Sequence, residues 1–263
     1  MRRQLRAFVL IVAVTTLHAG PMARAQSSDA APERGQALSG VLRTEAGRTL
    51  PHTEVLACSS TVCFFSESGS NGRFRFDLPA GPASYVIKTV EDVAMSPRRA
   101  AALMPIRLSG RAALDVGPVY VPSLPEPTAV LPGQDPQTLR LGDGLELTLS
   151  RMDLQLTPGK VLLGVAARRI PLDQAPDYRL PAHETVIAVF AMYPLGATSR
   201  SPIPVRAPST LPKGTPVRFR SVDDIDGTLS APVPGRATGT HVVTDGSAGI
   251  TRLTHVVITA VSQ

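Results

Sequence analysis

Alternation of apolar and polar residues along the chain predicts β-strands, and it is clearest in residues 66–90. Residues 73–78 read RFRFDL, so one face of the predicted strand is apolar and the other is charged. Asn71-Gly72 precedes this strand and predicts a tight type I′ hairpin turn, because both residues tolerate a positive φ. Pro79 to Pro82 ends the strand, and residues 85–90 predict the next one from their β-rich composition.

Similar patterns predict further strands on both sides of this stretch. Arg98 to Ala102 is the only helical feature of this part, a predicted single turn. The other predicted strands before residue 122 are Ala37–Arg43, Glu54–Ala57, Cys63–Ser66, an alternating segment around Met104, Ile106 and Leu108, and Ala112–Val121.

Similar patterns predict strands in the rest of the chain. Residues 145–149 read LELTL after a Gly142-Asp143-Gly144 turn, which predicts a hairpin with the preceding strand. Residues 185–193 read TVIAVFAMY, and this nearly unbroken apolar run predicts a strand central to a sandwich. The predicted strands are Thr138–Leu141, Leu145–Leu149, Leu154–Leu156, Val161–Val165, Thr185–Tyr193, Ile203–Arg206, Pro216–Ser221, Thr240–Thr244 and Leu253–Val261.

A Pro-rich segment divides these two groups of strands. Five prolines lie between Pro122 and Pro136, a composition that favours an extended, semi-rigid connector. We therefore predict an all-β protein with two tandem β-sandwiches that are independent of each other. The predicted parts are a signal peptide (1–25), a polar disordered leader (26–36), a first sandwich (37–121), the connector (122–137) and a second sandwich (138–263).

The N-terminus has the pattern of a cleaved secretory signal. Arg2, Arg3 and Arg6 precede an apolar run, residues 8–17, and Ala23-Arg24-Ala25 forms a cleavage site, so the mature chain is predicted to start at Gln26. Ten residues span only about 15 Å as a helix, too short for a membrane anchor. The prediction is an exported protein that is periplasmic, secreted or attached to the cell surface, without a transmembrane anchor.

The first predicted sandwich resembles a carboxypeptidase regulatory-like domain. The resemblance rests on Gly40-Val41, Glu54-Val55, the NGRFRF segment at 71–76 and the LPAG segment at 78–81, with Tyr85 two residues late. It covers residues 37–121, about a third of the chain, and implies a seven-stranded transthyretin-like or starch-binding-like sandwich. That pattern marks a fold more than a function.

The second half contains the segments LTPG, YPLGATSRSPIPV and LPKGTPVRF. In these segments it resembles, more loosely, the β-sandwich module of ankyrins and netrin receptors.

Cys58 and Cys63 are the two cysteines of the chain. In one continuous strand their Cα atoms would lie about 16 Å apart, beyond the roughly 4.4–6.8 Å of a disulfide. If residues 59–62 turn the chain, the two residues face each other across a hairpin, and export would supply an oxidising compartment. The alternatives are two buried free thiols or a redox-active pair, although the latter lacks a C-x-x-C spacing.

Charge argues against nucleic acid as a partner. The full chain carries a net charge of +6, and removal of Arg2, Arg3, Arg6 and Arg24 with the signal leaves 6 − 4 = +2. Without basic runs, such a balance gives no electrostatic footprint for nucleic acid.

Catalytic signatures are missing from the sequence. There is no G-x-S-x-G elbow, and His183-Glu184 lacks the second histidine of H-E-x-x-H, since Ile187 stands there. The Tyr-Arg-Gly-Ser ending of the transthyretin-like hydroxyisourate hydrolases is also absent. We therefore predict no catalytic residue, no cofactor and no metal centre. His241 and His255 lie on predicted strands and could be neighbours, but a third ligand is not evident.

Two weaker binding hypotheses remain. Asp223, Asp224 and Asp226 precede Gly227 and could offer oxygen ligands to Ca²⁺, although such clusters also form plain turns. Starch-binding modules share the expected fold, so the tyrosines Tyr85, Tyr120, Tyr178 and Tyr193 could contact a carbohydrate in a chain without Trp, and Tyr85 and Tyr120 are the two proposed contacts. The sequence thus favours a non-enzymatic binding or structural module whose partner, a protein or a polysaccharide, is unidentified; the alternative is a carbohydrate-binding protein.

Overall fold

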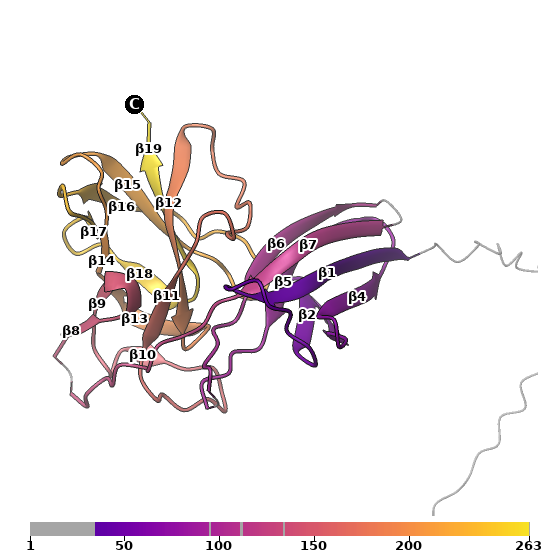
Figure 1. The fold of residues 1–263 in the computed structure, drawn as a ribbon. Coiled ribbons are helices and arrows are strands. Elements are labelled where there is room, and N and C mark those ends of the chain that lie inside the picture. The colour runs from indigo at the N-terminus through magenta and orange to yellow at the C-terminus, as the bar shows by residue number, and fades with distance from the viewer. Residues whose placement is uncertain (1–34, 95, 111–112, 134, 263) are drawn as a thin grey trace, which may run out of the picture. The chain divides into compact units, whose positions relative to one another are not determined.

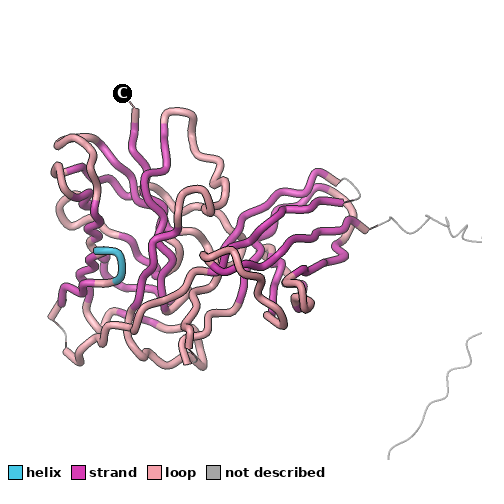
Figure 2. Tube along the Cα trace, in the orientation of Figure 1, coloured by secondary structure: helices cyan, strands magenta, loops and turns pink. Residues whose placement is uncertain are grey.

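The protein is described here from a computed structural model, which describes residues 35–94, 96–110, 113–133 and 135–262. Within these ranges the regular structure is β-strand apart from one short helical turn, η1 (Gly142–Gly144), as Figure 2 shows. The prediction of an all-β fold is therefore confirmed. The predicted signal peptide and residues 26–34 of the predicted leader lie outside the described residues.

Seven strands form the first half of the described chain, residues 35–121 (Figure 1). They are β1 (Gln36–Thr44), β2 (Glu54–Cys58), β3 (Cys63–Glu67), β4 (Arg73–Leu78), β5 (Pro82–Thr89), β6 (Leu103–Ser109) and β7 (Ala113–Val121). One sheet has the order β4-β1-β7, with β1 parallel to β7, and the other has the order β3-β2-β5-β6. The two sheets enclose an apolar core with Leu38, Phe74 and Ile87 among its buried members.

The charged and apolar alternation of β4 is confirmed. Phe74, Phe76 and Leu78 are buried, while the residues between them are exposed. Their burial against the facing sheet is the main favourable term for this strand, about 1.5–3 kcal/mol for each large side chain.

The turn before β4 differs from the prediction. Gly72 has φ +75°, but Asn71 is not in the left-handed region that a type I′ turn requires. Its side chain instead accepts a hydrogen bond from the Arg73 amide at 3.0 Å. The strands on either side belong to different sheets, β3 to one and β4 to the other. The chain still reverses tightly here, because the Gly69 amide donates to the Arg73 carbonyl and the Gly72 amide donates to the Gly69 carbonyl, both at 2.8 Å. The predicted tight turn is therefore present, but its type I′ conformation was wrong and it joins strands of two sheets.

Residues 98–102 also differ from the prediction. They form no helical turn; instead Arg99 makes isolated bridges to Asp92 and Ser123. The closing strand of the first half and the alternating strand around Ile106 occur as predicted.

Twelve strands form the second half. They are β8 (Gln137–Arg140), β9 (Glu146–Leu149), β10 (Leu154–Gln155), β11 (Ala166–Ile170), β12 (Glu184–Tyr193), β13 (Ala197–Ile203), β14 (Val205–Pro208), β15 (Pro216–Ser221), β16 (Val233–Ala237), β17 (His241–Thr244), β18 (Ile250–Leu253) and β19 (Val256–Val261). A nine-stranded sheet has the order β11-β12-β19-β15-β16-β17-β14-β9-β8, and β10-β13-β18 form a smaller sheet.

The β8–β9 hairpin occurs as predicted, with Leu145, Leu147 and Leu149 buried in the core of the second half. The strand predicted at Val161–Val165 was wrong. Val161 and Leu163 are largely exposed, and β11 starts only at Ala166. The apolar content of residues 161–165 was misleading because Val165 is buried and paired, through its isolated bridge to Thr128, whereas the residues before it form no strand.

Several strands are buried on both faces because the two halves pack together. In β12, Ala188, Phe190 and Met192 belong to the core of the second half, while the residues between them face the first half. In β2, Val55 and Ala57 face the core of the first half, while Leu56 and Cys58 face the second. We call the shared apolar contact the interface cluster; its buried members are Leu56, Cys58, Val86, Ala100, Ala101, Leu103, Leu124, Ala166, Ile170, Tyr178, Val189, Ala191, Tyr193, Leu195, Val222 and Val257.

The predicted independence of the two halves was therefore wrong. The described residues form a single compact unit, and the contact between the two halves is apolar like a core rather than small and polar. The Pro-rich connector is held by both halves. The Leu124 amide donates to the Arg98 carbonyl at 2.9 Å, and Thr128 exchanges backbone hydrogen bonds with Val165.

Candidate functional site

Polar contacts surround the interface cluster and fix one half against the other. Lys88 Nζ donates to the Asp224 carbonyl and His255 Nε2 donates to the Ala101 carbonyl, both at 2.8 Å. Glu91 forms an ion pair with Lys160 and accepts from the Leu195 amide at 2.8 Å. Glu45 accepts from Arg168 through both carboxylate oxygens at 3.1 and 3.2 Å, and its carbonyl accepts from Gln174 Nε2 at 3.1 Å. Because the partners come from both halves, these contacts orient the two sandwiches as well as joining them.

A groove opens beside the interface cluster and is lined by both halves. Its cavity volume is about 290 Å³. The first half contributes Ser84 from β5 and residues 105–107 from β6, and the second half contributes residues 177–179 and 226–229. Ligand sites often lie at such junctions and are largely pre-formed, so this groove is the strongest candidate for a binding site in the described chain.

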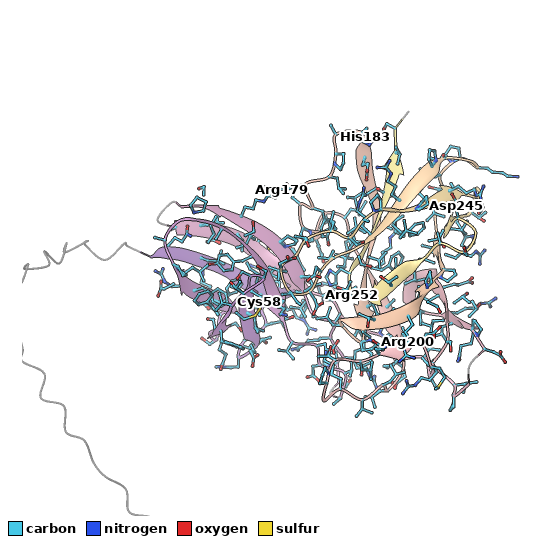
Figure 3. The ribbon with its side chains drawn as sticks, turned by 180° about the vertical axis from the view of Figure 1, so that it is seen from behind. Cys58, Arg179, His183, Arg200, Asp245 and Arg252 are labelled. Atoms are coloured by element: carbon cyan, nitrogen blue, oxygen red, sulfur yellow. A yellow bond between two sulfur atoms is a disulfide. The ribbon has the colours of Figure 1, made fainter. Side chains whose placement is uncertain are left out.

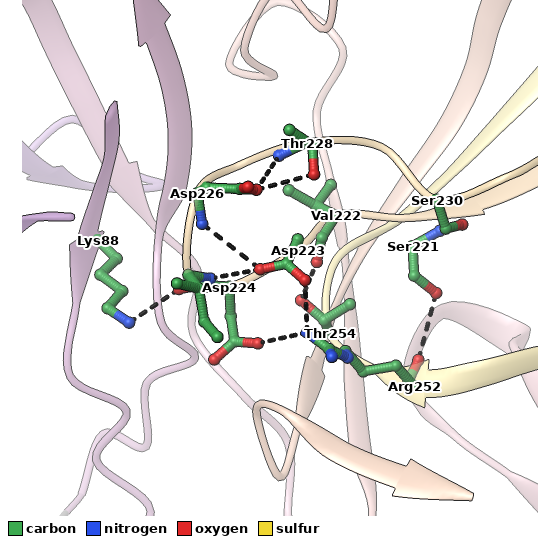
Figure 4. A network of polar contacts seen from close by, with 11 residues as sticks. Lys88, Ser221, Val222, Asp223, Asp224, Asp226, Thr228, Ser230, Arg252 and Thr254 are labelled. Carbon is green, nitrogen blue, oxygen red and sulfur yellow. Dashed lines mark hydrogen bonds and ion pairs between the residues drawn. The ribbon is translucent and has the colours of Figure 1, made fainter. Parts of the chain in front are cut away.

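The loop between β15 and β16 forms one wall of the groove, and its position depends on a glycine. Gly227 has φ +75°, and a Cβ atom there would lie 3.1 Å from the Cβ atoms of Pro105 and Val86. Arg252 holds the base of the loop by contacting Asp223 at 2.8 Å and Asp224 at 3.1 Å (Figure 4). A residue without a side chain is thus required where this loop meets the first half.

The loop between β11 and β12 forms the other wall. Tyr178 is buried in the interface cluster, and its hydroxyl has no hydrogen-bond partner among the described residues. Burial raises the pKa of this hydroxyl. Arg179 follows with φ +49°, an unusual conformation for arginine, and its amide donates to Asp177 Oδ1 at 2.9 Å. Figure 3 labels Arg179 at the junction of the halves.

The structure separates the two candidate tyrosines. Tyr85 is 5% exposed and packs edge-on against Phe64, with ring centroids 6.2 Å apart. It is therefore a core residue, and it cannot present a face to a sugar. Tyr120 is half-buried and lines a shallow hollow of about 370 Å³, together with Arg43, Arg73 and Asp115.

The aspartate loop does not have the geometry of a calcium site. Asp223 and Asp224 converge on Arg252, and Asp226 Oδ1 accepts from the amide and hydroxyl of Thr228 at 2.9 and 2.8 Å. Within the described ranges, no group of three or more His, Cys, Asp or Glu side chains is arranged to hold a metal ion. Arg252 and turn amides occupy both oxygens of Asp223 and one oxygen each of Asp224 and Asp226, so the three carboxylates are engaged separately.

His241 and His255 do not come together. β17, which holds His241, is separated from β19 by β15 and β16. His241 contacts Arg206 and Thr240, whereas His255 is buried and donates to Ala101. Burial lowers the pKa of His255 to about 4.

Glu184 also has a strongly displaced pKa. The Arg220 guanidinium donates to it at 2.9 Å, and Thr259 and Arg218 also donate. These bonds, led by that from Arg220, lower the pKa of Glu184 to about 2. A fully buried carboxylate held by two arginines is suited to structure rather than to proton transfer.

The predicted disulfide is confirmed. Cys58 and Cys63 are directly opposite each other in the β2–β3 pair, with an S–S distance of 2.07 Å. Cys58 is fully buried in the interface cluster, and Cys63 packs against it. The bridge therefore lies on the face of the first half that meets the second.

The groove residues Arg107, Asp177 and Arg179 were missed by sequence reasoning. They lie on separate elements and share no motif, so only the packing of the halves brings them together. The signal available in the sequence was indirect. Strands with apolar residues on both faces, such as residues 185–193 and 55–58, indicate a second layer of packing.

Comparisons with known proteins give no family for this chain. No family model and no curated protein matches it. Among solved structures, it aligns with the full-length major pilin SpaD from Corynebacterium diphtheriae at 11% identity and a TM-score of 0.27, over 88% of this chain and 57% of the pilin. The chain thus spans little more than half the length of that pilin.

Two further alignments are of the same quality. A DUF3823 family protein from Parabacteroides merdae aligns at 10% identity and a TM-score of 0.24, over 79% of this chain and 78% of that protein. The major pilin subunit of Bacillus cereus aligns at 10% identity and a TM-score of 0.26, over 87% and 59%. TM-scores this low carry no argument about this chain, and the carboxypeptidase regulatory-like resemblance remains a prediction.

The described residues include no helix that is long and apolar enough to cross a membrane.

Proposed function

We propose that this chain is an exported, non-enzymatic binding module that takes its ligand in the groove between its two halves. The observation that carries the proposal is the groove itself, whose walls come from both halves and are held in place by the interface cluster and its polar contacts. A pre-formed groove binds without first ordering its walls, which lowers the entropic cost of association.

Export is supported by the N-terminal pattern of residues 1–25 and by the Cys58–Cys63 disulfide. A mass spectrum of the exported protein should correspond to a chain that begins at Gln26 and is about 2 Da lighter than the reduced chain. An intact N-terminus on the exported protein, or free thiols, would contradict this part of the proposal.

A non-enzymatic role is supported by the state of the acid–base groups. Three acid–base groups in the described ranges have strongly displaced pKa values. Glu184 and His255 are buried, hydrogen-bonded and outside the groove, so neither is in reach of a ligand there. Tyr178 lines the groove, but burial raises the pKa of its hydroxyl, which therefore stays protonated and is not suited to act as a base.

The groove is tested by filling it. Ser84 is exposed in the wall, so Ser84→Trp should fold normally and block the cavity. Ser201, an exposed serine of β13 that does not line the groove, gives the matched control Ser201→Trp. Both variants and the parent chain would be screened against immobilised glycans and small acids, with melting temperatures as a check of folding. Ligands lost in Ser84→Trp and kept in Ser201→Trp support the proposal, whereas ligands kept in both contradict it.

Carbohydrate recognition by the first half is the second candidate, because Tyr120 lies in a hollow with arginine and aspartate side chains. Tyrosine rings and such polar groups are common in sugar sites. This reading predicts glycan binding that is weakened by Tyr120→Ala and unaffected by Ser84→Trp. The full chain is required for the test, because the first half alone would expose the apolar side chains of the interface cluster.

A further inference from the structure

Two arginines of the groove have no anionic partner. Arg107 comes from β6 and Arg179 from the loop between β11 and β12, and neither side chain forms an ion pair with any residue in the described ranges. Other arginines at the junction are paired: Arg168 with Glu45, and Arg252 with Asp223 and Asp224. The groove therefore offers two guanidinium groups, one from each half, to a ligand.

The groove also offers acceptors for hydroxyl groups. Asp177 Oδ1 accepts from the Arg179 amide, and Asp226 Oδ1 accepts from Thr228. Each carboxylate is thereby held by its own turn, and its Oδ2 oxygen has no partner within the described part of the chain. A bare anion would be repelled by these carboxylates, but a ligand with hydroxyl groups could donate to them. Ser84 supplies a further hydroxyl.

The backbone of the arginine-bearing wall is strained. Arg179 keeps φ +49° because its amide is bonded to Asp177 and because Tyr178, the preceding residue, is anchored in the interface cluster. Strain of this kind at a non-glycine residue concentrates at ligand sites, where it fixes the direction of a side chain. Within the described ranges, no ion pair of Arg179 offsets the free-energy cost of this strain, which is consistent with a role of Arg179 in binding.

From these observations we infer that the groove binds a hydroxy acid of monosaccharide size, with the chemistry of a uronic acid residue. The inference rests on the proposed function. Arg107 and Arg179 would bind the carboxylate, and Asp177 and Asp226 would accept from ring hydroxyls. A cavity of about 290 Å³ is at the lower end of the usual range for small ligands, which suits one sugar residue. Neutral sugars would leave both guanidinium groups without a partner.

Calorimetric titration of the mature full-length chain tests this inference. The probes are galacturonic acid, its short oligomers, neutral galactose oligomers of the same length, and inorganic phosphate. We expect a uronate probe to bind and the neutral oligomers not to. Binding of the monomer would identify a single residue or chain end as the ligand, and binding of oligomers alone would identify an internal segment; either result supports the inference.

Variants connect the binding to the two arginines. Arg107→Gln and Arg179→Asn should each weaken uronate binding about tenfold, the usual effect of losing one charge-assisted contact. Asparagine is chosen at position 179 because it tolerates a positive φ. Arg48→Gln is the matched control, an exposed arginine without a side-chain partner in the described ranges and outside the groove; it should leave binding unchanged. Melting temperatures near that of the parent chain establish that the variants are folded.

Three results would overturn the inference. They are equal binding of neutral and acidic oligomers, binding of phosphate without uronate, and no binding of any probe. If a ligand of another class is lost in Ser84→Trp, the proposed function stands without the uronate assignment. If uronate binds but is unaffected by both arginine variants and by Ser84→Trp, the groove itself is not the site, and both proposals fail.

Discussion

The buried imidazole of His255 should make the stability of the joined halves depend on pH. Its Nε2 atom is 2.8 Å from the Ala101 carbonyl, and a carbonyl only accepts, so Nε2 carries the proton of the neutral ring. Nδ1 is buried and has no partner among the described residues. Protonation would place a charge and a second N–H group in this apolar contact. Burial therefore lowers the pKa of His255 to about 4.

The size of the effect follows from the difference between folded and unfolded chains. An unfolded histidine has a pKa of about 6.5, so between about pH 6.5 and pH 4 the unfolded state binds more protons. Stability therefore falls as the pH falls through this window, and it changes no further from this group below about pH 4. At about 1.36 kcal/mol for each pH unit, the loss between pH 7 and pH 4.5 is roughly 2.5 kcal/mol.

Urea unfolding at about pH 7 and pH 4.5 measures this loss. Because the chain has no Trp, circular dichroism or tyrosine fluorescence is the signal. His255→Gln keeps a donor for the Ala101 carbonyl and removes the titration, so most of the pH dependence should disappear. His52 is exposed and contacts the exposed Glu67, so it gives the control His52→Asn, since asparagine tolerates its positive φ; this variant should keep the pH dependence of the parent chain. Glu184, with its pKa of about 2, contributes equally to all three. An undiminished pH dependence in His255→Gln would refute the reasoning.

Three further predictions concern the stability of the packed halves. Gly227→Ala should destabilise the chain by more than Gly159→Ala, because both glycines have a positive φ but only at Gly227 would the new Cβ meet other side chains; the backbone term alone is about 1–2 kcal/mol. Replacing Cys58 and Cys63 together by alanine should cost about 2 kcal/mol in the loop-entropy estimate, measured by urea unfolding. Glu184→Gln should cost about 3–5 kcal/mol, because it leaves buried Arg220 without its counter-charge.

Each of these predictions has a clear contrary result. Equal melting temperatures for the two glycine variants would show that the loop is not closely packed against the first half. Unchanged stability without the disulfide would mean that β2 and β3 pair equally well without the covalent link. A neutral Glu184→Gln would indicate that the arginines find other partners.

Local patterns predicted much of the fold, because the alternation of apolar and polar residues within a strand depends only on which face of that strand meets the core. The alternation at 73–78 and at 145–149 is of this kind, and both strands occur as predicted. Asn71-Gly72 predicted the tight turn but not its type, because only Gly72 takes a positive φ and the Asn71 side chain instead accepts from the Arg73 amide. The segment 161–165 failed because an apolar run without alternation gives no information about what covers it.

The candidate groove could not be predicted in the same way. Arg107 and Arg179 are 72 positions apart (179 − 107) and come together only when the halves pack. The sequence favoured independent sandwiches because a Pro-rich connector looks the same whether it is free or docked. Residues 55–58 and 185–193 carried the contrary signal, since a strand that is apolar on both faces needs a cover on both sides.

The apolar outer face of β2, β5 and β6 also constrains how the protein is made. A chain that emerges N-terminus first completes β1 to β7 before β12 and β19 exist, so Leu56, Val86 and Leu103 have no cover during that interval. Nascent intermediates with such faces are prone to aggregate. The first sandwich is therefore not an independent folding unit. Transplanted into another protein, it would need polar substitutions on this face or a new neighbour, and during synthesis it is the stage at which a chaperone would be most effective.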